Sequence, residues 1–263
     1  MPVNDELGKR MKEYESRNQY YLQKRTPVCI RVDMRAGHTF TRGFARPFDE
    51  VFGNAMVRTM EYCAKNIGNC VFAYCQSDEI TFILVDYAKL ETDAWFDYRT
   101  DKLCSISASM ATMAFNRFFE MEMNVFKAGH TIIDINEWAY PEAGALYGAY
   151  MLSASKGAMF DARCFNIPKE EATNLIYWRQ LDAARNSVQM VGQANFSHNE
   201  LQNKSCNMIQ DMLHEQRGIN WNDYPTRWKR GVAWKRSVGV DYAMPILKGE
   251  DRKYVDEVIF VGE

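Results

Sequence analysis

The sequence predicts an α+β fold whose strands and helices follow the order β-α-β-β-α-β. Apolar residues alternate with other residues through 71–75 and again through 80–84, which is the period-2 pattern of two half-buried strands. Apolar residues recur every three to four positions through 47–65 and 94–122, as they do in amphipathic helices. The content of 47% apolar and 25% charged residues is typical of a globular protein with a substantial core.

The first half of this order follows a charged, helix-prone segment at residues 5–24. Residues 27–34 then read as a strand with one apolar face, which carries Val28, Ile30, Val32 and Met34. Arg31 and Asp33 share the opposite face of this strand. A loop at residues 35–49 leads into the first of the two helices.

The second half begins with the strand pair, whose connection Gln76-Ser77-Asp78-Glu79 contains neither Gly nor Asn, although short hairpins favour them. The helix that follows is expected to bury one stripe of residues: Leu103, Ile106, Met110, Ala114 and Phe118. Residues 160–168 read as the fourth strand. The complete order is the split βαβ of a ferredoxin-like or polymerase-palm sheet.

No low-complexity linker divides the chain, so one compact unit is expected. Residues 1–168 form its palm-like catalytic portion, and residues 169–263 form a helical and basic C-terminal portion packed on it.

Composition excludes several classes of protein. No apolar run approaches the ~18 residues that span a membrane, and the N-terminus is too polar for a signal peptide, which predicts a cytoplasmic protein. The seven cysteines include no CxxC pair and read as buried thiols of a reducing compartment. The four histidines lack metal-binding spacing, and the net charge of −2 gives no global signal for nucleic acid.

Asp33 and Asp78 are the strongest candidates for a catalytic site. Asp33 ends the first strand and Asp78 lies at the hairpin turn, so the sheet topology brings both to one edge. Two neighbouring carboxylates repel unless a cation lies between them, and Mg²⁺ prefers such oxygen ligands. Two ions about 3.5–4 Å apart would clamp the attacking and leaving oxygens of a phosphoryl transfer. The alternative is that both are turn residues on solvated loops.

Two basic segments could contact phosphates at such a site. The loop RAGHTFTRGFARPFD has two glycines and offers Arg35, His38, Arg42 and Arg46. Arg99 and Lys102 lie three residues apart on one helix face. The residues alone leave it open whether these side chains bind phosphate or are solvated surface charges.

The motifs RVDMRAGHTF, FARPFDE, YCQSDEITFIL and YRTDK resemble, in order and spacing, those of the tRNA-histidine guanylyltransferase family of 3′–5′ nucleotide polymerases. FDAR, WRQLDAARNSV and YPTRWKRGVAWKR resemble its later motifs, so the resemblance covers roughly residues 5–236. It implies a palm sheet similar to that of 5′–3′ polymerases and a homotetramer built as a dimer of dimers.

The resemblance also implies roles for individual residues. Asp33, Asp78 and the backbone oxygen of Met34 would hold two Mg²⁺ ions, and Ser77 and Lys102 would assist activation and transfer. The nucleoside triphosphate would be bound by the residues around them: Arg35, Ala36, Gly37, His38, Arg46, Asp49, Ser77, Arg99 and Lys102.

The implied reaction runs opposite to ordinary polymerisation. The 5′-monophosphate of an RNA attacks the α-phosphate of ATP, which gives a 5′-adenylylated end and pyrophosphate. The 3′-hydroxyl of an incoming nucleotide, commonly GTP, then attacks that end and expels AMP. Both steps spread negative charge over phosphoryl oxygens, so positioning and electrostatic stabilisation should dominate catalysis.

Departures from the family pattern bear on specificity. Met34 stands where the family commonly has Gly, which a backbone oxygen ligand tolerates. Residues 184–187, Ala-Arg-Asn-Ser, replace the His-Ile-Asn-Asn that eukaryotic members carry in connection with the histidine anticodon. The chain therefore resembles more closely the members that repair truncated tRNA 5′ ends by templated addition, and strict specificity for tRNA-histidine is not expected.

Two segments are candidates for RNA binding. Arg179, Arg185 and Asn186 share a polar helix face that is either solvated or directed at RNA or nucleotide. Residues 227–236 place five basic residues, among them Arg227, Lys229 and Arg230, around two tryptophans. The alternative for this second segment is an edge strand protected by outward charges.

Two other functions compete with the tRNA nucleotidyltransferase. A nucleotidyl cyclase also uses a palm sheet with two metal-binding acids, but it would make a cyclic product without RNA. A non-catalytic RNA-binding module would present stacking aromatics on its central strands. The predicted central strands carry Asp33 and Asp78 instead, which disfavours that module.

Overall fold

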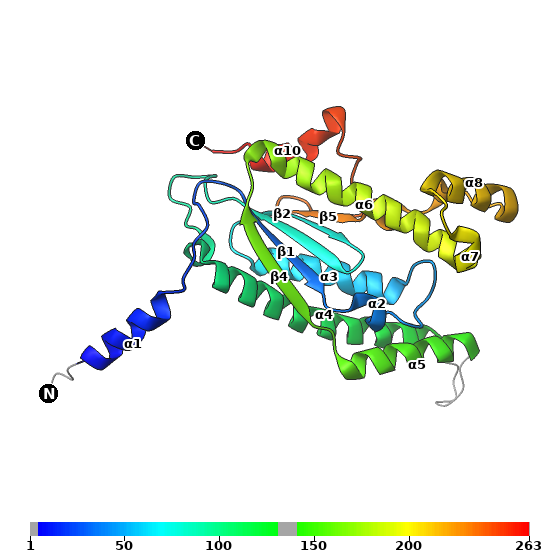
Figure 1. The fold of residues 1–263 in the computed structure, drawn as a ribbon, viewed down its shortest axis with the longest axis horizontal. Coiled ribbons are helices and arrows are strands. Elements are labelled where there is room, and N and C mark those ends of the chain that lie inside the picture. The colour runs from blue at the N-terminus through cyan, green and yellow to red at the C-terminus, as the bar shows by residue number, and fades with distance from the viewer. Residues whose placement is uncertain (1–4, 131–140, 263) are drawn as a thin grey trace.

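The computed structural model describes residues 5–130 and 141–262. A six-stranded antiparallel sheet in the order β4-β1-β3-β2-β5-β6 runs through its centre (Figure 1). The strands are β1 (Val28–Met34), β2 (Cys70–Gln76), β3 (Glu79–Leu84), β4 (Phe160–Asn166), β5 (Val232–Lys235) and β6 (Gly239–Asp241). The first four have the order of a ferredoxin-like palm, which confirms the predicted fold class.

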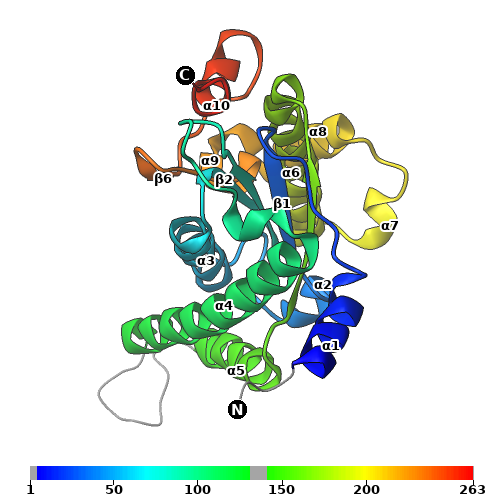
Figure 2. The ribbon, with the colours of Figure 1, turned by 90° about the vertical axis from the view of Figure 1, so that its left-hand side faces the viewer.

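Helices cover both faces of the sheet (Figures 1 and 2). One face packs on α3 (Glu50–Asn66) and α4 (Thr100–His130), and the other packs on α6 (Lys169–Asn195) and α10 (Lys253–Ile259). The remaining helices are α1 (Glu6–Ser16), α2 (Gly37–Phe40), α5 (Pro141–Lys156), α7 (His198–Leu201), α8 (Cys206–Arg217) and α9 (Thr226–Arg230). Within the described residues, 3₁₀ turns lie at Trp95–Tyr98, Trp221–Asp223 and Gly249–Arg252.

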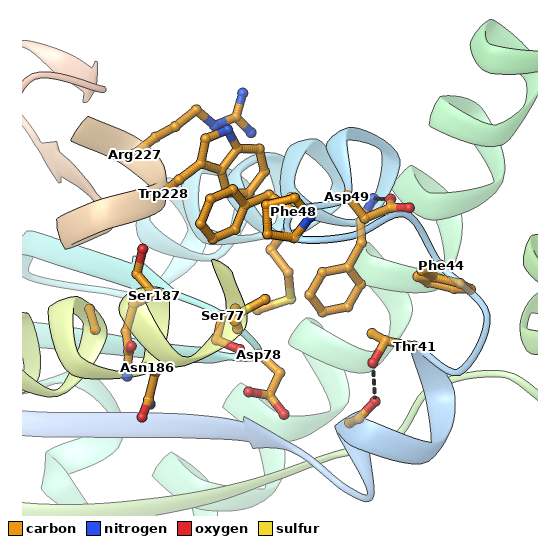
Figure 3. A pocket seen from close by; sticks show the side chains of 18 of the residues that line it. Thr41, Phe44, Phe48, Asp49, Ser77, Asp78, Asn186, Ser187, Arg227 and Trp228 are labelled. Carbon is orange, nitrogen blue, oxygen red and sulfur yellow. Dashed lines mark hydrogen bonds between the residues drawn. The ribbon is translucent and has the colours of Figure 1, made fainter. Parts of the chain in front are cut away.

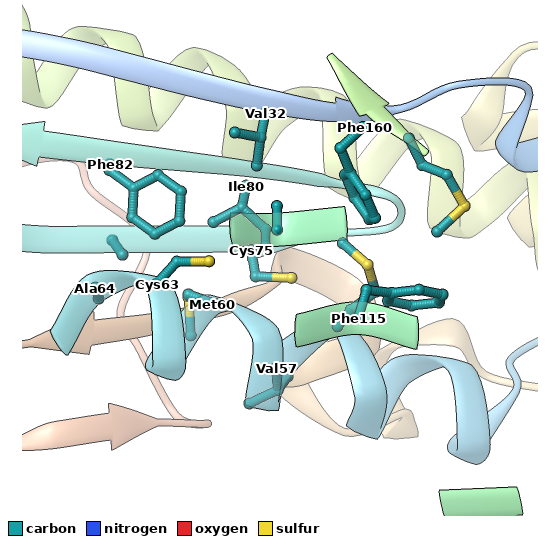
Figure 4. Close-up of a cluster of buried hydrophobic side chains, with 14 of the residues drawn as sticks. Val32, Val57, Met60, Cys63, Ala64, Cys75, Ile80, Phe82, Phe115 and Phe160 are labelled. Atoms are coloured by element: carbon teal, nitrogen blue, oxygen red, sulfur yellow. The ribbon is translucent and has the colours of Figure 1, made fainter. Parts of the chain in front are cut away.

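Strand alternation divides the core into two layers. The apolar face of β1 lies in the layer against α3 and α4, where Val32, Met60, Ile80 and Phe115 meet (Figure 4). Cys29, on the opposite face of β1, belongs to the layer beneath α6 and α10. The predicted two-sided pattern of residues 27–34 is therefore confirmed.

The buried stripe of α4 differs from the prediction. Ile106, Met110 and Phe118 are only partly buried, and the fully buried positions are Leu103, Ser107, Ala111, Ala114, Phe115, Phe119 and Met123. Small residues at Ser107 and Ala111 let the helix approach its neighbours closely, whereas the prediction favoured the larger apolar side chains. The helix also extends to His130, and α5 was not predicted at all.

The C-terminal portion contributes strands as well as helices. β5 pairs with β2 on one side and with β6 on the other, so it is not an edge strand. The edge-strand interpretation of residues 227–236 is therefore wrong: Trp234 and Lys235 are buried, and Lys235 pairs with Glu257 at 2.8 Å.

All seven cysteines are free thiols. Cys29, Cys63, Cys70 and Cys75 are buried as predicted, whereas the other three, Cys104, Cys164 and Cys206, are only partly buried. Within residues 5–130 and 141–262, no helix combines the length and the hydrophobicity that crossing a membrane requires.

Candidate active site

The ends of β1 and of the β2–β3 hairpin meet at one edge of the sheet. Asp33 lies opposite Glu79 in the β1–β3 register, and the backbone N–H of Met34 donates to the carbonyl oxygen of Asp78 at 3.0 Å. On its other side Asp33 lies opposite Asp161 of β4. The structure therefore brings Asp33 and Asp78 together, as the topology predicted, and it adds a third acid that the sequence analysis missed.

The hairpin tip adopts an uncommon backbone conformation. Ser77 has a φ of +49°, in the left-handed region that non-glycine residues rarely occupy. The carboxylate of Asp78 lies directly over Gly37, where an added Cβ would be 2.0 Å from Oδ2. Gly37 follows Ala36, which also has a positive φ of 56°. The RAGH segment thus supplies a glycine at a point where the carboxylate of Asp78 leaves no room for a Cβ.

The negative charge of the acids at this edge is only partly offset by the neighbouring arginines. Partial burial raises the pKa of Asp33, and the neighbouring Asp78 and Asp161 raise it further, whereas Arg163 and Arg31 oppose that shift. Neighbouring carboxylates that repel one another favour a bound cation. Their oxygen-only chemistry fits Mg²⁺, because that ion takes one or two carboxylates and completes its coordination with water and substrate phosphates. Within the described chain, no cluster of three or more His, Cys, Asp or Glu side chains is arranged to hold a metal by itself.

A cavity of about 470 Å³ opens beside the hairpin tip (Figure 3). Its walls come from residues 37–57, the tip, α6 and α9. One wall is aromatic: the rings of Phe48 and Trp228 stack at 5.1 Å with an interplanar angle of 5°, and the Arg227 guanidinium lies 4.3 Å from the Trp228 ring. A pocket that combines aromatic walls, a hairpin serine and an acid suits a heteroaromatic ligand with a charged tail.

The predicted nucleotide-binding residues fall into three groups. Gly37, His38, Arg46, Asp49 and Ser77 line this cavity. Arg35 and Ala36 are exposed on the loop before α2 and do not line it. Arg99 and Lys102 form the third group and lie at the start of α4.

Arg99 and Lys102 are remote from the hairpin tip. The carbonyl of Thr100 lies near Cys164, which pairs with Ile30, whereas Thr112 contacts Phe160, which pairs with Met34. The first turn of α4 therefore lies toward the opposite end of the sheet (Figure 1). Arg99 pairs there with Asp101 at 2.8 Å, and Lys102 is exposed. Their contact with a triphosphate stays a prediction.

Asp49 has a structural function in addition to its place in the cavity wall. Its Oδ1 accepts from the N–H of Phe52 at 2.8 Å as the N-cap of α3. Its Oδ2 accepts from the N–H of Ala45 at 2.9 Å and from the hydroxyl of Tyr150 at 2.6 Å. Oδ1 thus caps α3, and Oδ2 holds the loop and α5 in place.

The predicted RNA-binding residues differ in their accessibility. Arg185 is 65% exposed, whereas the side chain of Arg179 is only 11% exposed and pairs with Glu79 at 2.7 Å and Asp182 at 3.2 Å. Lys229 is buried and donates to the carbonyl of Asn222, so the expectation of an outward charge is wrong for this residue.

The other residues of this group lie close to the cavity. Asn186 and Arg227 line it, which favours the nucleotide-facing interpretation of that helix face for Asn186. Arg230 is half-buried at the end of α9.

Most of the apolar cavity wall was not predicted from the sequence. Phe48 and Met190 line it from segments 142 residues apart, which no local pattern connects. The only available signal was the position of Phe48 within FARPFDE. The signal for Asp161 was clearer, because its strand pairs with β1 and the alternation of apolar and polar residues sets the register of that pair.

Comparisons with known proteins place these features in context. Residues 8–168 match the family model described as tRNAHis guanylyltransferase. A bacterial tRNA(His) guanylyltransferase-like protein in complex with ATP is 35% identical, with a TM-score of 0.81, and the alignment covers 97% of this chain and 100% of that chain. A bacterial tRNA(His) guanylyltransferase-like protein in complex with GTP is 32% identical, with a TM-score of 0.71, and this alignment also covers 97% of this chain and 100% of that chain. The tRNA(His) guanylyltransferase of Saccharomyces cerevisiae is 26% identical over 78% of this chain and 80% of its own length.

Proposed function

Because this chain belongs to the tRNAHis guanylyltransferase family, we propose that it adds nucleotides to the 5′ end of tRNA in the 3′–5′ direction. Members of the family are nucleotidyltransferases, and the chain is an enzyme of that class. The observation that carries the proposal is the meeting of Asp33 and Asp78 beside a cavity of about 470 Å³, a volume typical of small-molecule sites.

ATP and GTP are the proposed small substrates, in line with the complexes of the bacterial guanylyltransferase-like proteins. The base would lie against the stacked Phe48 and Trp228, which offer a flat apolar surface. The phosphates would extend toward Ser77 and the loop that carries His38 and Arg46, since these polar groups line the same cavity next to Asp78.

Two Mg²⁺ ions would be held by the Asp33 and Asp78 carboxylates and the carbonyl oxygen of Met34, and they would neutralise charge on the phosphoryl oxygens. The chain itself fixes these ligands through the β1–β3 register and the close contact of Asp78 with Gly37. Ser77 lies next to Asp78 and is exposed, so its hydroxyl can donate to a phosphate oxygen.

The proposed reaction has two steps. The 5′-monophosphate of the RNA attacks the α-phosphate of ATP and releases pyrophosphate. The 3′-hydroxyl of an incoming nucleoside triphosphate then attacks the adenylylated end and expels AMP. In both, the chain positions the reacting phosphate and excludes water, and guanidinium and N–H donors offset the developing charge.

Template-dependent repair of truncated tRNA is the form of this activity that we propose. The identity with the bacterial guanylyltransferase-like protein, at 35%, exceeds the 26% identity with the yeast enzyme. The Ala-Arg-Asn-Ser segment at 184–187 lies on α6, and Asn186 within it lines the cavity rather than a remote surface. Pairing with the 3′ strand of the acceptor stem would then select the nucleotide.

Extension of a truncated tRNA tests this proposal. A 5′-³²P-monophosphate tRNA that lacks its first nucleotide is incubated with Mg²⁺, ATP and all four nucleoside triphosphates. We expect addition of the base complementary to the 3′ strand, and a decrease of at least about a hundredfold in the Asp78→Ala variant, because one of two metal-binding carboxylates is lost.

The pattern of products separates the competing activities. Addition of G to tRNA-histidine alone would favour the single-guanylate reaction over repair. Absence of extension on every tRNA, with ATP binding intact, would contradict the polymerase and direct attention to cyclic nucleotide products.

A homotetramer, built as a dimer of dimers, is the proposed assembly. Apolar side chains remain exposed on two helices in mutual contact, at Met113, Met121, Val125, Met151 and Leu152. Light scattering should give about four times the mass of one chain. A Val125→Glu variant should shift this value downward if that surface is an interface. A monomer mass for the unaltered protein would contradict the assembly.

A further inference from the structure

Trp178 is a large aromatic side chain that does not line the cavity. It lies on α6 and is 53% exposed. The guanidinium of Arg179 lies 4.8 Å from the centre of its ring, and that of Arg31 lies 5.9 Å away. These two cation–π contacts hold the indole in place while leaving about half of its surface open to solvent.

The contacts of Trp178 lead directly to the acidic edge of the sheet. Arg31 lies two residues before Asp33 on the same face of β1, roughly 7 Å along the strand. Arg179 donates through Nε to Glu79, the residue after Asp78, at 2.7 Å. Trp178 therefore contacts one arginine on the strand that carries Asp33, and another that is hydrogen-bonded to the residue after Asp78.

Trp178 and the cavity approach the two aspartates from different sides. The cavity is formed by residues 37–57, the hairpin tip, α9 and the part of α6 from Ala183 onward, on the β2 side of the sheet, and Trp178 precedes that part of α6. Trp178 contacts Arg31 of β1, whose other neighbour is the edge strand β4. A nucleotide in the cavity and a second reactant beside Trp178 would thus meet at Asp33 and Asp78.

We propose that the solvent-exposed part of the Trp178 ring stacks on the base at the 5′ end of the RNA substrate and so places the 5′-phosphate at the two aspartates. This inference rests on the proposed function, because it assigns the position of the RNA end in that reaction. Trp178 acts here as a binding and positioning residue.

Stacking on a base fits this surface better than binding of the phosphate backbone does. The arginines around Trp178 already have acidic partners: Arg163 pairs with Asp161 at 3.5 Å, Arg185 with Asp182, and Arg179 with both Glu79 and Asp182. The surface is therefore nearly balanced in charge. Its unusual feature is exposed apolar area, which Leu181 extends at 52% exposure. Aromatic side chains bind bases in this way without regard to sequence.

A fluorescent base at the RNA end provides the test. An acceptor-stem hairpin with a 5′-monophosphate carries 2-aminopurine, whose emission decreases on stacking, as its 5′-terminal base. We expect the unaltered protein to quench this emission and the Trp178→Leu variant to lose most of the quenching. The kcat/KM for RNA should fall roughly tenfold to a hundredfold, whereas ATP affinity without RNA should change less than about twofold.

Two controls separate stacking from a structural role. Trp178→Phe keeps an aromatic face and should retain most of the quenching. Phe260→Leu removes an aromatic residue that is also 53% exposed but lies in the C-terminal segment, and it should have no effect. Equal quenching in the unaltered and Trp178→Leu proteins, with RNA binding intact by fluorescence anisotropy, would overturn the inference alone. Failure of the unaltered protein to bind the hairpin would overturn the proposed function with it.

Discussion

Gly37 shows how much of the site depends on one residue without a side chain. A Cβ at this position would lie 2.0 Å from Oδ2 of Asp78, so the Gly37→Ala substitution must displace that carboxylate. We expect at least about a tenfold loss of extension activity, since small displacements of a catalytic group have large effects on rate. The midpoint of thermal unfolding should change little, because Asp78 is only partly buried and lies outside the hydrophobic core.

The matched control is Gly148→Ala. Gly148 lies in α5, and among the described residues no atom beyond its chain neighbours and its own helix backbone lies within 4 Å of an added Cβ. Alanine should therefore leave activity unchanged and stabilise the helix by up to about 1 kcal/mol. Full activity in Gly37→Ala, measured by extension of truncated tRNA, would contradict the placement of Asp78 as a metal ligand against this glycine.

At the scale of elements, an ion pair joins α6 to the β2–β3 hairpin. Arg179 and Glu79 are 100 residues apart in sequence, and their side chains are only 11% and 12% exposed. The Nε atom of Arg179 lies 2.7 Å from Oε1 of Glu79. The Arg179→Gln substitution would leave Glu79 partly buried with only Arg31, 3.6 Å away. We expect a loss of about 3 kcal/mol in the free energy of unfolding, measured by urea denaturation.

Arg185 provides the comparison on the same helix. It also pairs with an acid, Asp182, but its side chain is 65% exposed. The Arg185→Gln substitution should cost less than about 1 kcal/mol, because solvent screens exposed ion pairs. Similar losses for both variants would show that the contact with Glu79 contributes nothing beyond an ordinary surface pair.

At the scale of the whole molecule, the acidic edge should link magnesium to stability. Mg²⁺ that binds the folded chain alone stabilises it by about 2.7 kcal/mol at a hundred times its Kd, so the melting temperature should rise with Mg²⁺. The Asp33→Asn variant should lose this dependence. Without metal it should melt about 2 °C higher than the unaltered protein, because Asp78 and Asp161 no longer face a third charge.

Thermal unfolding followed by fluorescence, with and without Mg²⁺, checks both parts. An equal response to Mg²⁺ in the two proteins would place the cation elsewhere. A lower melting temperature of Asp33→Asn in the absence of metal would mean that the carboxylate is already compensated in the folded chain.

Several features could be predicted because they depend on residues close together in sequence. Alternation fixed the faces of β1, and hydrophobic spacing located α3, so the β-α-β-β-α-β order followed. The meeting of Asp33 and Asp78 followed from that order, since β1 and the hairpin are neighbours in such a sheet. In α4 the prediction was right for Leu103 and Ala114 but wrong for the other three positions, because small buried residues such as Ser107 carry no hydrophobic signal.

The sequence by itself determined the fold class, the family and the acidic pair, because each depends on short patterns read in order along the chain. Only the tertiary structure decided the rest. It assigned Asp49 to holding a loop, buried Lys229, moved Arg99 and Lys102 away from the hairpin, and set Trp178 beside Arg31. Each of these outcomes depends on where distant segments pack. A side chain's function is set by the neighbours that such packing supplies, and residues more than a hundred positions apart give no local sign of it.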